Sequence, residues 1–160
     1  MLVQHVLVPI DFSSTADRAL EYAIALAQQL QARLTLLHVL HLNPLAMGEM
    51  TTGMTATYLE AQETEAHQLL QASLDRVQHA GLQGDSLLVQ GTPTQAIAET
   101  AGEQRVDLII MGTHGRAGLA HVFLGSVAEH VIRHAPCPVL VIRKAPDTPI
   151  ASENASPDQP

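Results

Sequence analysis

Residues 106–111, VDLIIM, lead directly into residues 111–127, MGTHGRAGLAHVFLGSV, and this junction decides the fold. The first run is short, rich in branched residues and almost wholly apolar, which is typical of a strand buried on both faces of a sheet. The second run contains four glycines, which predict a loop: Gly112, Gly115, Gly118 and Gly125. We therefore expect a buried strand that ends in a glycine-rich loop.

The loop has the features of an anion site. Glycines let the backbone take unusual dihedral angles and bring its N–H groups close to a ligand. Ser126 opens a helical pattern, and Ser126-Val127-Ala128-Glu129 predicts a capping box. A helix N-terminus attracts phosphate because its unpaired N–H groups and its dipole face the ligand.

The spacing G-x2-G-x9-G-S matches neither G-x4-G-K-[ST] nor G-x-G-x-x-G, and no lysine follows Gly125. On loop chemistry alone, two interpretations therefore stand. The loop either binds phosphate or is a structural connection to a capped helix.

Composition limits the possible partners. A chain of 160 residues is the size of one domain, and its 46% hydrophobic content is ample for one core. Aromatic residues make up only 2%, so aliphatic side chains must build that core. Eight Lys and Arg stand against sixteen Asp and Glu, and the formal net charge of −8 argues against a nucleic-acid partner.

The single cysteine, Cys137, excludes an intramolecular disulfide and fits a reducing compartment. We interpret it as a small packing residue. The N-terminus lacks a basic region before its apolar run, and no apolar stretch approaches the ~20 residues that span a bilayer. We expect a cytoplasmic protein without membrane insertion.

Hydrophobic periodicity predicts an alternation of strands and helices along the whole chain. Apolar runs predict strands at residues 2–10, 33–40, 85–90, 106–111 and 138–143. Helical patterns follow each of the first four strands. A second capping box, Ser14-Thr15-Ala16-Asp17, marks the first helix. The third helix starts at Thr92 and Pro93, and the second covers about residues 55–80.

This order predicts a single-domain α/β fold, an open five-stranded parallel sheet with helices on both faces. In such sheets ligands bind beyond the carboxyl ends of the strands. Asp11 follows the first strand and Gly112 ends the fourth, so both belong to that edge. The glycine loop therefore lies where a binding site is expected.

The end of the chain predicts an interface and a tail. The last strand is apolar on both faces over residues 139–142, and such an edge invites pairing with a second copy. Residues 145–160 are rich in proline, small and acidic residues, which predicts a disordered tail. The folded domain is expected to cover residues 1–144.

These features together resemble the universal stress protein family. The resemblance is carried by VLVPIDFS at residues 6–13, LLHV at 36–39, DLIIMGTHGRAGL at 107–119 and LGSVAEHVIRHAPCPVLVIR at 124–143. It extends to the glycine spacing that ATP-binding members of the family carry. It implies a Rossmann-like sheet of strand order 3-2-1-4-5 and a homodimer formed through the last strand.

The resemblance also implies a set of ATP-binding residues. Asp11 is expected near the ribose, with Pro9 and Ile10 beside it, and the backbone of Val39 is expected to contact adenine. The residues that would line the ribose and base are Met111 and Gly112, and those at the phosphates are Gly115, Arg116, Gly125, Ser126 and Val127, with His114 in the same loop. Mg²⁺ could be held through the phosphates.

Simpler interpretations of three of these residues remain open. Asp11 could form only an Asx-type turn or a helix cap, Arg116 could be a surface charge, and His114 could only order the loop. No catalytic residue and no metal-ligand set is assigned.

The resemblance favours an ATP-binding regulatory or stress-response module with little or no hydrolysis, acting on an unknown client protein. Two alternatives remain. One is a slow ATPase or phosphotransferase that uses His114, and the other is a nucleotide-free dimeric interaction protein.

Overall fold

Five parallel strands form the central sheet of the protein, for which the computed structural model describes residues 2–41, 52–113 and 124–143. The strands are β1 (His5–Pro9), β2 (Arg33–Leu40), β3 (Gly84–Gln90), β4 (Leu108–Gly112) and β5 (Val139–Ile142). They lie in the spatial order β3-β2-β1-β4-β5. The predicted fold class is confirmed, as is the strand order that the family resemblance implies.

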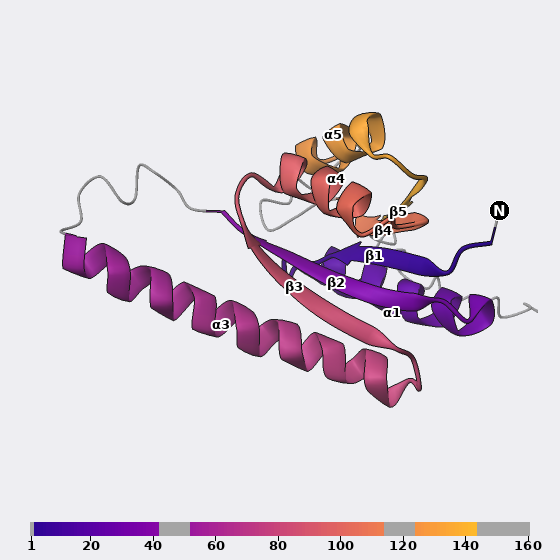
Figure 1. Cartoon of the computed structure of the whole chain (residues 1–160), viewed down its shortest axis with the longest axis horizontal. Coiled ribbons are helices and arrows are strands. Elements are labelled where there is room, and N and C mark those ends of the chain that lie inside the picture. Colours follow the sequence, from indigo (N-terminus) through magenta and orange to yellow (C-terminus); the bar gives the residue numbers. More distant parts are fainter. Residues whose placement is uncertain (1, 42–51, 114–123, 144–160) are drawn as a thin grey trace, which may run out of the picture.

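Helices cover both faces of this sheet (Figure 1). They are α1 (Ser14–Leu30), α3 (Thr52–His79), α4 (Pro93–Glu103) and α5 (Ser126–His134), with α1 and α3 on one face and α4 and α5 on the other. In the described ranges no helix is both long and apolar enough to cross a membrane. The predicted tail, residues 145–160, lies outside those ranges.

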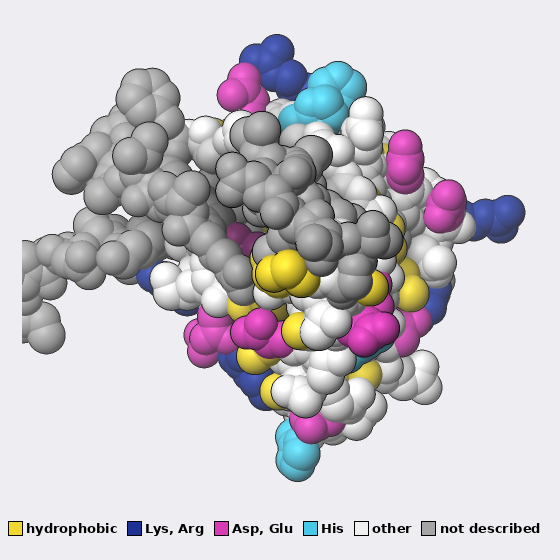
Figure 2. Space-filling model, turned by 90° about the vertical axis from the view of Figure 1, so that its left-hand side faces the viewer, with side chains coloured by type: hydrophobic (Ala, Val, Ile, Leu, Met, Phe, Trp, Pro, Cys, Tyr) yellow, Lys and Arg dark blue, Asp and Glu magenta, His cyan; other side chains and the backbone are white. Residues whose placement is uncertain are grey.

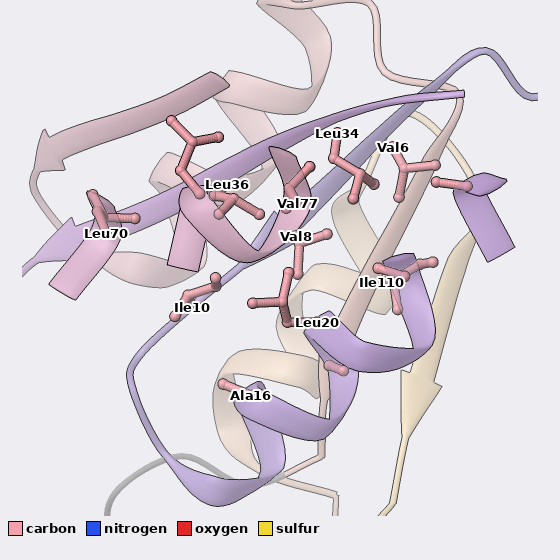
Figure 3. Close-up of a cluster of buried hydrophobic side chains, with 14 of the residues drawn as sticks. Val6, Val8, Ile10, Ala16, Leu20, Leu34, Leu36, Leu70, Val77 and Ile110 are labelled. Carbon is pink, nitrogen blue, oxygen red and sulfur yellow. The ribbon is translucent and has the colours of Figure 1, made fainter. Parts of the chain in front are cut away.

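The alternation of side chains along the strands divides the core into two apolar layers. Figure 3 shows the layer between the sheet and helices α1 and α3, where Leu20 of α1 and Leu70 and Val77 of α3 meet the strands. Its strand residues include Val6, Val8, Leu34, Leu36 and Ile110. The intervening residues Leu7, Leu37, Ile109 and Met111 form the layer beneath α4 and α5.

Cys137 belongs to this second layer. It is half-buried there, and burial raises the pKa of its thiol. A protonated, packed thiol agrees with its interpretation as a packing residue.

The cap of α1 differs from the sequence prediction by one residue. Ser13, not Ser14, is the N-cap, and its hydroxyl oxygen accepts a hydrogen bond from the N–H of Ala16 at 3.2 Å. The reason lies in Asp11, whose carboxylate accepts from both the N–H and the hydroxyl of Ser13. This turn fixes Ser13 in the extended conformation that an N-cap requires.

A chain of polar side chains crosses the amino-terminal edge of the sheet. His5 of β1 is only 4% exposed, and its Nδ1 lies 2.9 Å from the guanidinium of Arg33. Because arginine only donates, Nδ1 accepts, and the Nε2–H of neutral His5 donates to the hydroxyl of Thr35 at 2.8 Å. Thr35 in turn donates to the carboxylate of Asp85 on β3. Side chains therefore link the starts of β1, β2 and β3.

The surroundings of His5 favour its neutral form. Burial is the main cause of its lowered pKa, and the positive charge of Arg33 lowers the pKa further. The pKa of His5 is raised by a backbone hydrogen bond with Gln104 and by the negative charges of Asp85 and Asp107, but these effects do not reverse its net decrease. The pKa of Asp107 is itself lowered, because its carboxylate accepts the amide N–H groups of Gln4 and His5.

This environment predicts that acid destabilises the protein through His5. Unfolded histidine takes up a proton near pH 6.5, whereas the native state resists protonation, so the unfolded state binds more protons as the pH falls below that value. The free energy of unfolding should therefore decrease from about pH 7 towards pH 5, by at most about 1.4 kcal/mol per pH unit for this one group. Urea titrations across this range measure the slope.

The variant His5→Gln can keep both hydrogen bonds and cannot titrate, so its slope should be smaller than that of the wild type. His79→Gln, which replaces an exposed histidine on α3, serves as the matched control for the same substitution elsewhere. Equal slopes in His5→Gln and the wild type would contradict the prediction.

Candidate functional site

The candidate site lies where β1 and β4 separate in the middle of the sheet. Their pairing covers only Val6↔Leu108 and Leu7↔Ile109, although both strands run further. From β1 the chain passes through α1 to β2, and from β4 it passes through α5 to β5, on the opposite side. This reversal of strand order is the place where doubly wound sheets open a crevice at their carboxyl ends.

The first wall of the crevice expected at this position is the end of β1. Pro9 and Ile10 are buried, and the N–H of Ile10 donates to the carbonyl of Leu37 at 2.8 Å. Asp11 is half-buried, and its Oδ1 accepts from Ser13 N–H at 3.0 Å and from Ser13 Oγ at 2.6 Å. Asp11 therefore forms the Asx-type turn that was one of its two interpretations.

Phe12, between Asp11 and Ser13, has a strained backbone. Its φ angle is +61°, which is rare for a bulky side chain and marks a site that the surroundings hold in place. The Phe12 ring lies against the ring of His38, with centroids 4.5 Å apart and planes at 34°. The Nδ1–H of His38 also donates to the carbonyl of Ile10 at 2.7 Å.

The second wall is the end of β4. Met111 is only 5% exposed, and Gly112 closes the strand. A Cβ atom at Gly112 would lie 3.0 Å from the backbone carbon and oxygen of Thr15, so this glycine lets β4 approach the start of α1. Thr113 follows, buried, with its N–H donating to Ile142 at 3.0 Å.

A hydrogen bond of 2.8 Å from the N–H of Gly125 to the carbonyl of Thr113 joins the two sides of the glycine loop. It places the start of α5 beside the end of β4. The strand and the helix N-terminus that the sequence predicts on either side of the loop are therefore both present and adjacent. Residues 114–123, which include His114, Gly115 and Arg116, lie outside the described residues.

The predicted capping box at the start of α5 is wrong. Gly125 is the N-cap and offers no side chain to the helix, while Ser126 is already the first helical residue. The carboxylate of Glu129 accepts a hydrogen bond from Arg133 at 2.8 Å, one turn further along, instead of turning back. The N-cap residue therefore makes no side-chain hydrogen bond to the amide groups of the first turn, which suits an anion at this helix end.

Val39, the remaining predicted residue, lies near the end of β2 and is half-buried. The structure thus gathers the described predicted residues at the carboxyl edge, although their roles in binding stay predictions. Sequence reasoning missed Phe12, Ser13 and His38 as site residues. A histidine within the apolar run RLTLLHVL was the one available signal for His38.

In the described part of the chain, no group of three or more His, Cys, Asp or Glu side chains is arranged to hold a metal ion.

Comparison with known proteins establishes the family. Residues 3–143 match the model of the universal stress protein family, and the chain belongs to this family. It is 32% identical over 143 residues to the universal stress protein MJ0531 of Methanocaldococcus jannaschii, covering 89% of this chain and 84% of that protein. This agrees with the resemblance that the sequence motifs indicate.

Solved structures show the same fold. The protein MJ0577 of M. jannaschii superimposes with a TM-score of 0.81 at 30% identity, covering 91% of this chain and 99% of that one. A universal stress protein in complex with cAMP gives a TM-score of 0.68 at 25% identity, covering 91% and 100%. The Archaeoglobus fulgidus protein in complex with dAMP gives 0.61 at 25% identity, covering 89% and 99%.

The contact at Gly112 leads to a prediction about packing. The variant Gly112→Ala should lose about 1–3 kcal/mol of stability, because the added methyl group meets the backbone of Thr15, which cannot move aside cheaply. Chemical unfolding measures the loss. Gly102→Ala in α4 is the control, since its Cβ would only touch Pro136 at 3.9 Å, and it should keep or raise the stability. Equal stabilities in the two variants would refute this account of Gly112.

Proposed function

We propose that the protein binds an adenine nucleotide, ATP, in the crevice between β1 and β4 and acts as a nucleotide-dependent regulatory module. The observation that supports this proposal is the arrangement where the strand order reverses. The Asp11 turn follows β1 there, and the start of α5, whose N-cap is a glycine, lies beside the end of β4. A carboxylate suits ribose hydroxyl groups, and a helix N-terminus suits phosphates.

Membership of the family suggests the following assignment of groups, with which the described geometry is compatible. Pro9, Ile10, Asp11, Met111 and Gly112 surround the ribose and base, and the backbone of Val39 contacts adenine. Gly125, Ser126 and Val127 hold the phosphates from the helix end. His114, Gly115 and Arg116 complete the phosphate site from the loop, and Mg²⁺ is held through the phosphates.

The nucleotide complexes of related proteins support the adenine part of the proposal. The proteins that bind cAMP and dAMP share this fold over about nine-tenths of the chain. Both ligands contain adenine, a sugar and phosphate.

Little hydrolysis is expected from this site. Phosphoryl transfer to water needs a positioned water molecule and neutralisation of the leaving phosphate. The residues assigned to the phosphates include one fixed cation, Arg116, and no carboxylate. A nucleotide-dependent switch that acts on a client protein fits these groups better than turnover does.

Mass spectrometry of the purified protein after acid extraction tests the central claim. A bound adenine nucleotide in stoichiometric amount is expected. Its absence, together with no binding of added ATP or AMP, would favour the nucleotide-free interaction protein. Phosphate release near 1 s⁻¹ or faster, abolished in His114→Ala, would favour the phosphotransferase.

Asp11 offers a test that separates binding from turn formation. The variant Asp11→Asn keeps an oxygen that can accept from Ser13 and removes the negative charge, so the fold should persist. Its affinity for AMP should fall by about 10- to 100-fold if the carboxylate binds the ribose hydroxyls. Calorimetric titration measures the affinity. An unchanged value would mean that Asp11 forms the turn and does not contact the nucleotide.

We also propose a homodimer through β5, which lies at an edge of the sheet with all four residues partly exposed. The N–H groups of Ile109 in β4 and of Thr113 just after it donate to the carbonyls of Pro138 and Ile142. The backbone groups of the even-numbered residues of β5 therefore face β4, and those of Val141 point away from the sheet. The variant Val141→Pro removes an outward N–H and should give monomers in sedimentation experiments while the unfolding temperature changes little. A persistent dimer would place the interface elsewhere.

A further inference from the structure

The ladder of backbone hydrogen bonds between β1 and β2 ends one bond earlier than the length of β2 would allow. It begins with the N–H of Arg33 donating to Gln4 at 2.9 Å and ends with the N–H of Ile10 donating to Leu37 at 2.8 Å. In an evenly spaced parallel ladder, the next rung would join the N–H of Val39 to the carbonyl of Ile10. The pairing of the two strands ends instead at Pro9↔Leu37.

A side chain replaces that missing rung. The carbonyl of Ile10 accepts a hydrogen bond of 2.7 Å from Nδ1–H of His38, the neighbour of Val39. Within the described ranges, no backbone hydrogen bond joins Val39 to Ile10 or to Phe12, its next partner in a continued ladder. The N–H and carbonyl of Val39 therefore face the space that β1 has left.

The ring of His38 makes a second contact with the same turn. It lies against Phe12, with centroids 4.5 Å apart, where φ is +61°. Asp11 and Ser13 close the turn on its other side. His38 thus holds residues 10–12, where the chain leaves β1, by a hydrogen bond and by a ring contact.

We propose that His38 is a positioning residue for nucleotide binding, which keeps the ladder open and presents the backbone of Val39 to the base. The inference rests on the proposed function. Adenine carries an acceptor, N1, beside a donor, the N6 amino group, and the N–H and carbonyl of one strand residue complement that pair. Hypoxanthine reverses the pair, so AMP and IMP distinguish this recognition mode from a contact with the sugar or phosphate.

Amide hydrogen exchange in the ligand-free protein tests the open ladder. In the wild type, the Val39 amide should exchange at least about tenfold faster than the Leu37 amide within the ladder. The variant His38→Phe keeps a ring and loses the donor, so the Ile10 carbonyl should recapture and protect the Val39 amide. His38→Asn keeps an N–H donor and should behave like the wild type. Equal protection of Val39 in the wild type and His38→Phe would overturn the inference.

Nucleotide titrations test the consequence for recognition. The wild type should bind AMP about tenfold or more tightly than IMP, since IMP leaves the groups of Val39 unpaired. This ratio should approach one in His38→Phe and be retained in His38→Asn. His79→Phe is the control, because Nδ1 of His79 also bonds a backbone carbonyl, that of Asp75, away from the crevice.

A purely structural role for His38 predicts another result, namely lower stability with an unchanged ratio of AMP to IMP affinity, and that result would overturn the positioning role. If the wild type binds neither nucleotide, the proposed function fails. The exchange rate at Val39 then still decides whether His38 holds the ladder open.

Discussion

The burial of β1 on both faces and both edges is the constraint on which the rest of the structure depends. All five of its residues are buried between two apolar layers, and β2 and β4 pair with its two edges. Such a strand has no water to satisfy its polar groups, so each must find a partner in the protein. At its start, Arg33 and Thr35 satisfy the side chain of His5, and Asp85 accepts a hydrogen bond from Thr35.

At the other end, the same requirement shapes the crevice. Beyond Leu7↔Ile109 the strand has lost its ladder with β4, and beyond Ile10 it loses its ladder with β2. At this end the imidazole of His38 donates to the carbonyl of Ile10, and the carboxylate of Asp11 accepts the N–H of Ser13. Polar side chains thus take over from the ladder where the chain leaves the sheet.

The sequence predicted what depends on apolar periodicity and on strong local signals. The strand at residues 33–40 was predicted with both of its ends, because an apolar run there is bounded by polar residues. The strand at residues 2–10 proved shorter, since it begins at His5, and Leu2 is 76% exposed. Hydrophobicity alone does not show where pairing with a neighbour stops.

The two wrong caps have a related cause. A pattern such as S-x-x-E or S-x-x-D covers only four consecutive residues, whereas the caps of α1 and α5 are set by contacts with residues outside those four. Asp11 selects Ser13, and the hydrogen bond from Gly125 to Thr113 starts α5 one residue early. The role of His38 was hidden for the same reason, because its partner Ile10 lies 28 residues away.

The proposed site depends largely on backbone groups. In the proposed complex, the base meets the N–H and carbonyl of Val39, and the phosphates meet amides at the start of α5. These backbone groups are present whatever the side chains are, provided that strand and helix end where they do. In this proposal a chain with a formal charge of −8 holds an anionic ligand without a basic surface, because oriented backbone dipoles at the helix end and the single charge of Arg116 supply the attraction.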